Sequence, residues 1–223
     1  MKSVWWCLGA WAVGASLVAC KPKPAPVVDA GAAPVKKALG PIAPGETRVD
    51  VEKSKLSLSI IKDRDTKSPV TATMGVRDGA IALGAGTARL SVDLDTFDSS
   101  IPLRNERVRG VFFETSGIGW DTAELTIAKL PDDVIAAVRD KKKVTGAKLD
   151  ADLKIHGKTA KVALVVDAFS MGGTLMVKSA QPVEVKVSDF GLTDNLKRLS
   201  SLCMHDSIDD VVKVDVSLEF PPK

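Results

Sequence analysis

Four segments alternate strictly between apolar and polar side chains, and this period of two constrains the fold more than any other feature of the sequence. The segments are residues 55–60, 89–95, 183–187 and 212–220. In the second of them, the apolar side chains that share one face are Leu90, Val92 and Leu94. Alternation with one polar face is typical of antiparallel strands that cover a single core. The sequence therefore predicts an all-β domain.

Further strands are predicted between short turn signals. They lie near residues 70–75, 79–83, 120–127, 144–156, 160–166 and 174–178. The turn pairs that separate them are Asp78-Gly79, His156-Gly157 and Gly172-Gly173. One segment alone predicts a helix, near 131–141, because a proline and two aspartates begin it and basic residues end it. We expect about eight antiparallel strands with this one short helical excursion.

Such a set of strands can close in two ways. A barrel removes exposed strand edges, whereas a sandwich packs two sheets face to face. Periodicity does not distinguish them. With about eight strands, a barrel interior is either filled by side chains or able to hold one small ligand.

Residues 1–19 have the features of a secretory signal peptide. Lys2 is followed by an apolar stretch from Val4 to Val18, which suits a signal peptide and is short for a membrane span. The stretch ends in Leu-Val-Ala-Cys20, which resembles the bacterial lipobox. This resemblance implies a palmitoylated lipoprotein in which acylated Cys20 becomes the N-terminus and anchors the chain to the membrane. Lys21 follows where an inner-membrane retention signal has aspartate, so we expect the outer membrane, facing the periplasm or the cell surface.

Residues 20–46 are predicted to form a disordered tether, and residues 47–223 the folded domain. The tether is rich in proline, alanine and lysine and lacks periodicity. Such a segment buries too little apolar area to offset the entropy of ordering it. Its prolines favour extended geometry.

Charge and reactive side chains argue against several functions. The net charge is +3, with lysines and acids interspersed outside the tether, so we expect no nucleic-acid partner. After loss of Cys7 and acylation of Cys20, Cys203 has no partner for an intramolecular disulfide. Cys203, His205 and Asp206 lack a second cluster to complete a metal site, so no metal is expected. Two histidines and no Gly-x-Ser-x-Gly motif also argue against an enzyme.

Three motifs resemble those of the YceI-like family. LRNERVRGVFFE, at 103–114, resembles the family's Arg-Asp-x-His-Leu…Phe-Phe segment. DLKIHGKTAKV, at 152–162, resembles its Gly-x-Leu-Thr-Ile-His-Gly-Val-Thr-Lys-Pro-Val hairpin, and SDFGL, at 188–192, resembles Ser-Asp-Phe-Gly-Ile. The similarity runs from about 48 to 220. The departures are Asn105 for Asp, Arg107 for His, Asp152 for Gly, and Ala160 in a hairpin that lacks the usual proline.

The resemblance implies a lipocalin-like antiparallel barrel that holds a long isoprenoid in its interior. The candidate lining residues are Leu90, Val92, Leu94, Phe97, Phe112, Phe113, Leu153, Ile155 and Phe190. Phe112 and Phe113 are consecutive, so in extended chain only one of them would face the interior. The alternative for the phenylalanines is plain core packing.

Arg104 is the family's matched arginine and the candidate for contact with a polar or phosphorylated headgroup. The alternative is an arginine that organises its loop through a carboxylate or carbonyl. Arg107 and Arg109 are expected in solvent, and His156 in a turn. Cofactors are not expected, apart from a bound polyisoprenoid.

Two functions stay open. The first is a membrane-anchored lipoprotein that binds a polyisoprenoid or quinone-like lipid for carriage or sequestration in the cell envelope. The second is a solid barrel or sandwich that serves as an interaction module without a small ligand. They differ in whether the interior of the domain is hollow.

Overall fold

The computed structural model describes residues 44–63, 67–117 and 119–222. The predicted signal peptide, Cys20 and nearly all of the predicted tether lie outside the described residues, so these remain predictions.

The strands are β1 (Thr47–Arg48), β2 (Lys55–Lys62), β3 (Ser68–Ala82), β4 (Thr87–Asp98), β5 (Thr122–Ile127), β6 (Val144–Ile155), β7 (Lys158–Met171), β8 (Thr174–Ser179), β9 (Val183–Lys186) and β10 (Val211–Phe220). The α-helices are α1 (Pro102–Arg107), α2 (Asp132–Arg139) and α3 (Thr193–Leu202). A π-helix, η1 (Val108–Phe112), continues α1, and a 3₁₀-helix, η2 (Val187–Phe190), follows β9.

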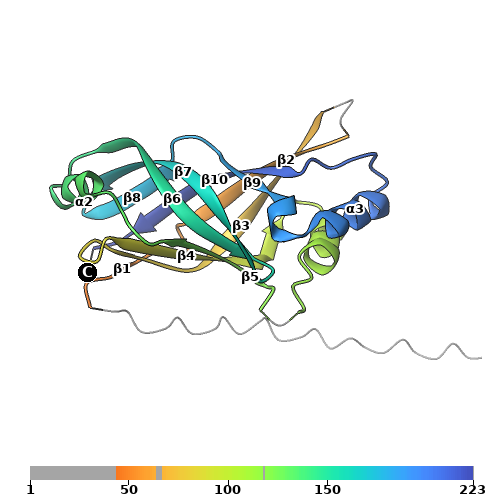
Figure 1. The fold of residues 1–223 in the computed structure, drawn as a ribbon, viewed down its shortest axis with the longest axis horizontal. Coiled ribbons are helices and arrows are strands. Elements are labelled where there is room, and N and C mark those ends of the chain that lie inside the picture. Colours follow the sequence, from red (N-terminus) through yellow and green to blue (C-terminus); the bar gives the residue numbers. More distant parts are fainter. Residues whose placement is uncertain (1–43, 64–66, 118, 223) are drawn as a thin grey trace, which may run out of the picture. The chain divides into compact units, whose positions relative to one another are not determined.

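The strands close into an antiparallel barrel, which confirms the predicted fold class (Figure 1). Within the described residues the order β3-β2-β10-β8-β7-β6-β5-β4 is completed by pairing of β4 with β3, which makes a ring of eight strands. β1 adds to β3, and β9 pairs with β10 beyond the part of β10 that β8 occupies. Because the ring is closed, the alternating apolar residues of all eight strands face one shared interior.

The turn predicted at Asp78-Gly79 is wrong. β3 runs through this pair as one strand, and its register against β4 shifts between Val76 and Asp78. The Asp78 carboxylate accepts a hydrogen bond from the Gly79 N–H and forms ion pairs with Arg48 and Arg89, so the pair is held within the sheet. The other two predicted turns are present, with φ of 52° at His156 and 60° at Gly172.

The helical excursion near 131–141 is confirmed as α2, but the expectation of a single helix is wrong. α1, η1, η2 and α3 form further helices, and none of them has a long amphipathic repeat. Each has one to three turns. Its few apolar side chains can be identified as core residues only once the structure shows them packed on the barrel. Across the described ranges, no helix is both long and apolar enough to cross a membrane.

These additional helices lie together at one end of the barrel, which we call the helical end (α1, η1, η2 and α3; Figure 1). The paired strand ends at Lys62 of β2 and Ser68 of β3, and the β6–β7 turn, lie at the same end. β1, α2 and the β3–β4 turn lie at the opposite end. The two ends of the interior are therefore covered by different elements.

Candidate functional site: apolar cavities inside the barrel

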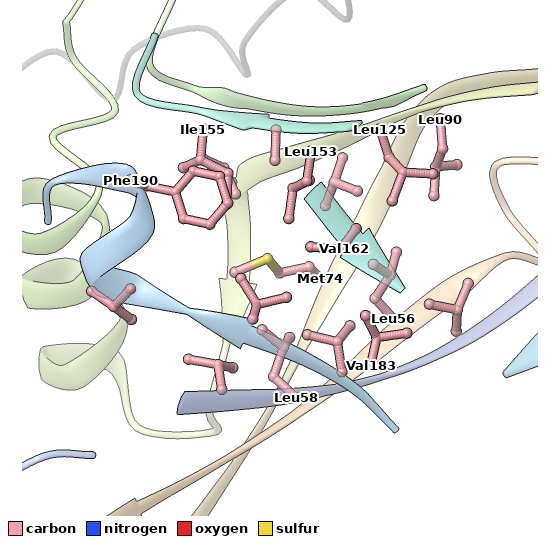
Figure 2. A pocket seen from close by; sticks show the side chains of 18 of the residues that line it. Leu56, Leu58, Met74, Leu90, Leu125, Leu153, Ile155, Val162, Val183 and Phe190 are labelled. Atoms are coloured by element: carbon pink, nitrogen blue, oxygen red, sulfur yellow. The ribbon is translucent and has the colours of Figure 1, made fainter. Parts of the chain in front are cut away.

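A cavity of about 130 Å³ occupies the middle of the barrel. Figure 2 shows aliphatic, methionine and phenylalanine side chains that surround it from several strands and from η2. The labelled ones are Leu56, Leu58, Met74, Leu90, Leu125, Leu153, Ile155, Val162, Val183 and Phe190. Every residue that lines this cavity is apolar.

The burial of β10 indicates that the interior is hollow. Val212, Val214 and Val216 point inward and line the central cavity, yet they are only half-buried. In a filled core, close packing leaves few voids larger than a water molecule. Inward side chains that keep accessible surface therefore border empty space.

Two more cavities continue this space toward the two ends of the barrel. One of about 100 Å³ lies at the helical end and shares Met74, Phe112 and Phe113 with the central cavity. Another of about 110 Å³ lies toward the opposite end and shares Leu90 and Leu125 with it. We call the three the cavity series. Their partitions consist of side chains, and Met74 is unbranched with several rotatable bonds, so small rotamer changes would join neighbouring cavities.

All nine candidate lining residues lie on the walls of the cavity series. Leu90, Val92, Leu94, Leu153, Ile155 and Phe190 line the central cavity, Phe97 lines the cavity at the helical end, and Phe112 and Phe113 line both. Contact of these residues with a lipid remains a prediction.

The expectation that Phe112 and Phe113 point to opposite faces is wrong. Both are buried, and their rings meet edge to face with centroids 4.8 Å apart. Phe112 ends the π-helix η1 and Phe113 follows it in helical conformation. Side chains therefore do not alternate here as they do in a strand, and both rings reach the interior.

Sequence reasoning missed part of the wall. Leu56, Leu58 and the inward valines of β10 lie at alternate positions of predicted strands, so the same period of two could have identified them. Leu196 and Leu199 of α3 line the cavity at the helical end, but α3 was not predicted.

The central cavity has no basic lining residue, whereas the cavities at the two ends do. Arg89 lines the cavity at the opposite end. Lys62, Arg104 and His205 line the cavity at the helical end. Lys62 Nζ lies 3.5 Å and His205 Nδ1 3.4 Å from the Asp63 carboxylate. Arg104 is half-buried, and its guanidinium has no hydrogen bond or ion pair within the described part of the chain. It can therefore interact with an anionic or polar group without first breaking another contact.

Other residues organise the loop beside Arg104. The Asn105 amide oxygen accepts hydrogen bonds from the Ser99 N–H at 2.8 Å and the Ser99 hydroxyl at 2.7 Å. Its amide nitrogen donates to Asp98 at 2.8 Å. Hydrogen bonds from the Ser100 N–H and then from Asn105 lower the pKa of Asp98. Asn105 thus holds this turn through both ends of its amide.

Arg107 and Arg109 are half-buried, so the expectation that they lie in solvent is wrong. Arg109 donates to the carbonyl oxygens of Asp95, at 3.0 Å, and Asn105, at 3.3 Å. Arg107 Nη1 lies 3.7 Å from the Cys203 sulfur. Arg107 and Arg109 are therefore engaged by different partners.

His156 lies in the predicted turn, and its side chain also joins separate elements. Its ring stacks on Trp120 with centroids 3.8 Å apart, and Nε2 lies 3.2 Å from the Glu114 carboxylate. Glu114 also lies 3.7 Å from Arg198 of α3. This contact set links the β6–β7 turn to the helical end. Among the described residues, no three His, Cys, Asp or Glu side chains gather as metal ligands.

Comparison with known proteins agrees with this geometry. A model of the YceI-like domain family matches residues 48–220. The chain is similar in structure to a polyisoprenoid binding domain from Saccharophagus degradans implicated in plant cell wall breakdown, with 24% identity and a TM-score of 0.70 over 80% of this chain and 99% of that chain. It is also similar to BcnA of Burkholderia cenocepacia, with 17% identity and a TM-score of 0.53 over 77% of this chain and 98% of that chain. No curated protein matches the chain. At these identities the two structures establish a common fold.

Proposed function

Because this chain belongs to the YceI-like domain family, we propose that it binds one long apolar lipid, of the polyisoprenoid or quinone class, inside its barrel. The observation that carries the proposal is the cavity series along the interior. The relative from Saccharophagus degradans, a polyisoprenoid binding domain, supports it.

The size and chemistry of the cavities suit such a lipid. An apolar cavity of about 150 Å³ stays dry and accepts a benzene-sized molecule. Each of the three cavities is of that order, so each suits a fragment about as large as one or two isoprene units. Consecutive cavities with shared walls favour a chain of such fragments over a single compact ligand.

The membrane anchor is part of the proposal. An isoprenoid with about 1,000 Å² of surface gains about 25 kcal/mol on leaving water, at about 25 cal/mol per Å². A bilayer offers nearly the same gain, so moving the lipid from bilayer to barrel is almost neutral, and shape and a headgroup contact decide affinity. Acylation at Cys20 would keep the barrel at a high effective concentration near membrane lipid. We therefore propose a lipid-anchored protein of the cell envelope, at the outer membrane, that carries or sequesters lipid without acting as an enzyme.

Arg104 is the proposed headgroup contact. Arg104 lines the cavity at the helical end, and its guanidinium has no hydrogen bond or ion pair among the described residues. A lipid that fills the cavity series would reach this point with one terminus. Charge-assisted hydrogen bonds make arginine suited to phosphate or carbonyl oxygens there.

The test is extraction of the purified full chain with organic solvent, followed by mass spectrometry. We expect a long apolar lipid in near-stoichiometric amount from the wild type. Val214→Phe places a larger side chain into the central cavity and should reduce the recovered lipid strongly, because the inward valine borders empty space.

Val211→Phe is the matched control. It makes the same change on the same strand, at an odd-numbered position whose side chain points away from the cavity. It should retain the lipid. Recovery of no lipid from the wild type would favour the solid interaction module.

A further inference from the structure

Among the described residues, large apolar side chains are exposed on and beside α1 and α3 at the helical end. Ile101 is 45% exposed, Leu103 55%, Leu202 49% and Met204 91%. Leu103 lies one turn before Arg107 on the same face of α1, and Arg107 contacts Cys203, which lies between the other two. Leu103 therefore lies near the exposed side chains at and just after the end of α3. Together with Ile101, which directly precedes α1, we call them the apolar rim (Ile101, Leu103, Leu202 and Met204).

The apolar rim borders the cavity at the helical end. The same two helical segments that expose the rim also supply walls of this cavity, through Arg104 and Val108 on one side and Leu199 and Cys203 on the other. Arg104 on the wall, half-buried and without a side-chain partner among the described residues, places this cavity next to solvent, since such side chains are rarely buried without a partner. The rim thus lies beside a cavity of the series that comes close to the surface.

The helices that carry the rim have an excess of positive charge. Residues 102–109 contain three arginines and one glutamate, and α3 contains Lys197 and Arg198 against Asp194. Apolar side chains next to basic ones are typical of helices that lie in the surface of an anionic bilayer.

We propose that the helical end docks on the surface of a lipid bilayer, with the apolar rim in the headgroup layer and the cavity series facing the membrane. This inference rests on the proposed function, because it gives the bound lipid a route between bilayer and barrel that avoids water. A second copy of the chain is a poorer occupant. The rim exposes a few hundred Å² of side chain, whereas a stable protein interface takes about 800 Å² from each partner.

The chain that precedes the barrel is long enough for this pose. Cys20 and Thr47, the first residue of β1, are separated by 26 residues, which span at most about 90 Å when extended. β1 lies at the end opposite to the rim, and the 15 residues of β3 span about 50 Å. A barrel anchored at Cys20 can therefore turn its helical end toward the same membrane.

The experiment uses the full chain in phosphatidylcholine vesicles with or without phosphatidylglycerol. The photoreactive residue p-benzoylphenylalanine replaces Met204 in one variant and Met171 in another. Met171 is the matched control, because it is also an exposed methionine, 65% accessible, but lies beside the β7–β8 turn at the opposite end. After illumination, adducts are identified by mass spectrometry.

We expect lipid adducts at position 204 and few at position 171, with about fivefold more adduct when phosphatidylglycerol is present. Leu103→Gln combined with Leu202→Gln should reduce the adduct at 204, and circular dichroism would check that this variant is folded. Equal lipid adducts at both positions, none at 204, or a crosslink between two copies at 204 would each overturn the docking proposal. The proposed function is tested separately, by solvent extraction. If that function fails, extraction recovers no interior lipid, whatever the pattern of adducts at positions 204 and 171.

Discussion

At the scale of single residues, Arg77 joins three neighbouring strand positions on the outside of the barrel. Its guanidinium donates to Asp121 at 2.8 Å and to Asp93 at 2.9 Å, and it also bonds Thr122. Desolvation of Asp121 acts to raise its pKa, but the hydrogen bond and the charge of Arg77 outweigh this and hold the pKa below its ordinary value. The cluster connects β3 with β4 and with the start of β5.

This pKa shift predicts a pH dependence of stability. A carboxylate whose pKa is lowered by folding stabilises the folded state at pH values above its unfolded pKa, which is about 3.9 for aspartate. This stabilisation is lost as the pH falls through the folded pKa. Asp121→Asn should therefore lower the free energy of unfolding at pH 7 and reduce the further loss on acidification below about pH 4. Urea unfolding at a series of pH values measures both.

Asp150→Asn is the control for this prediction. Asp150 is an exposed carboxylate of β6 without a hydrogen bond or ion pair in the described part of the chain. It should leave the acid dependence as in the wild type. If Asp121→Asn lost as much stability on acidification as the wild type does, the Arg77 contact would not be the cause.

Among the elements, β3 depends on a glycine within the strand, near its C-terminal end. A Cβ at Gly79 would lie 3.0 Å from Leu90 Cδ1, 3.1 Å from Val49 Cγ1 and 3.2 Å from the Arg89 carbonyl oxygen. The register shift before it increases the local twist of the strand, as bulges do, and lets β3 follow the curve of the closed barrel. The pair Asp78-Gly79 thus serves close packing between β3 and β4 instead of a turn.

We predict that Gly79→Ala destabilises the barrel by about 1–3 kcal/mol, as overpacking of a filled site does. Gly84→Ala is the matched control, since nothing lies within 4 Å of a Cβ there and Gly84 has no positive φ. That variant should be neutral or more stable by about 0.4–1 kcal/mol. The two free energies of unfolding come from urea titrations, and equal values would contradict the packing argument.

The strands were more predictable than the helices for a physical reason. A period of two repeated over residues 89–95 or 212–220 is a local signal, because each inward side chain has the same role. α1 is short, and α3 lacks the proline at its start and the basic residue in its last turn that identified α2. Their apolar residues either face a cavity, as Leu196 does, or are exposed, as Leu202 is. Nothing in the local sequence separates these two roles.

At the scale of the whole molecule, the hollow interior has a thermodynamic consequence. The cavity walls lack the contacts that a filled core would supply, so a lipid that fills them stabilises the folded state by mass action. The proposed ligand would therefore also be part of the core of the protein.

Removal of the lipid should lower the melting temperature of the full chain by about 5–10 °C. A free lipid concentration of about 100 times Kd stabilises the folded state by about 2.7 kcal/mol. Each kcal/mol shifts Tm by about 2–4 °C for a protein of this size. Calorimetry of the protein before and after extraction measures the change. Val214→Phe should show a much smaller shift, because its central cavity is partly filled. An unchanged Tm in the wild type would mean that no stabilising ligand had been bound.

The sequence by itself determined the all-β class, the approximate number of strands, the inward residues of most strands and the family, because alternation and short motifs are local properties of the chain. Only the tertiary structure decided between barrel and sandwich, since closure requires β10, the last strand, to pair with β2, near the start of the domain. It also decided that the interior holds cavities and that Phe112 and Phe113 both reach them. Whether apolar side chains fill the space that they enclose depends on how strands from the whole chain fit together, and no single segment carries that information.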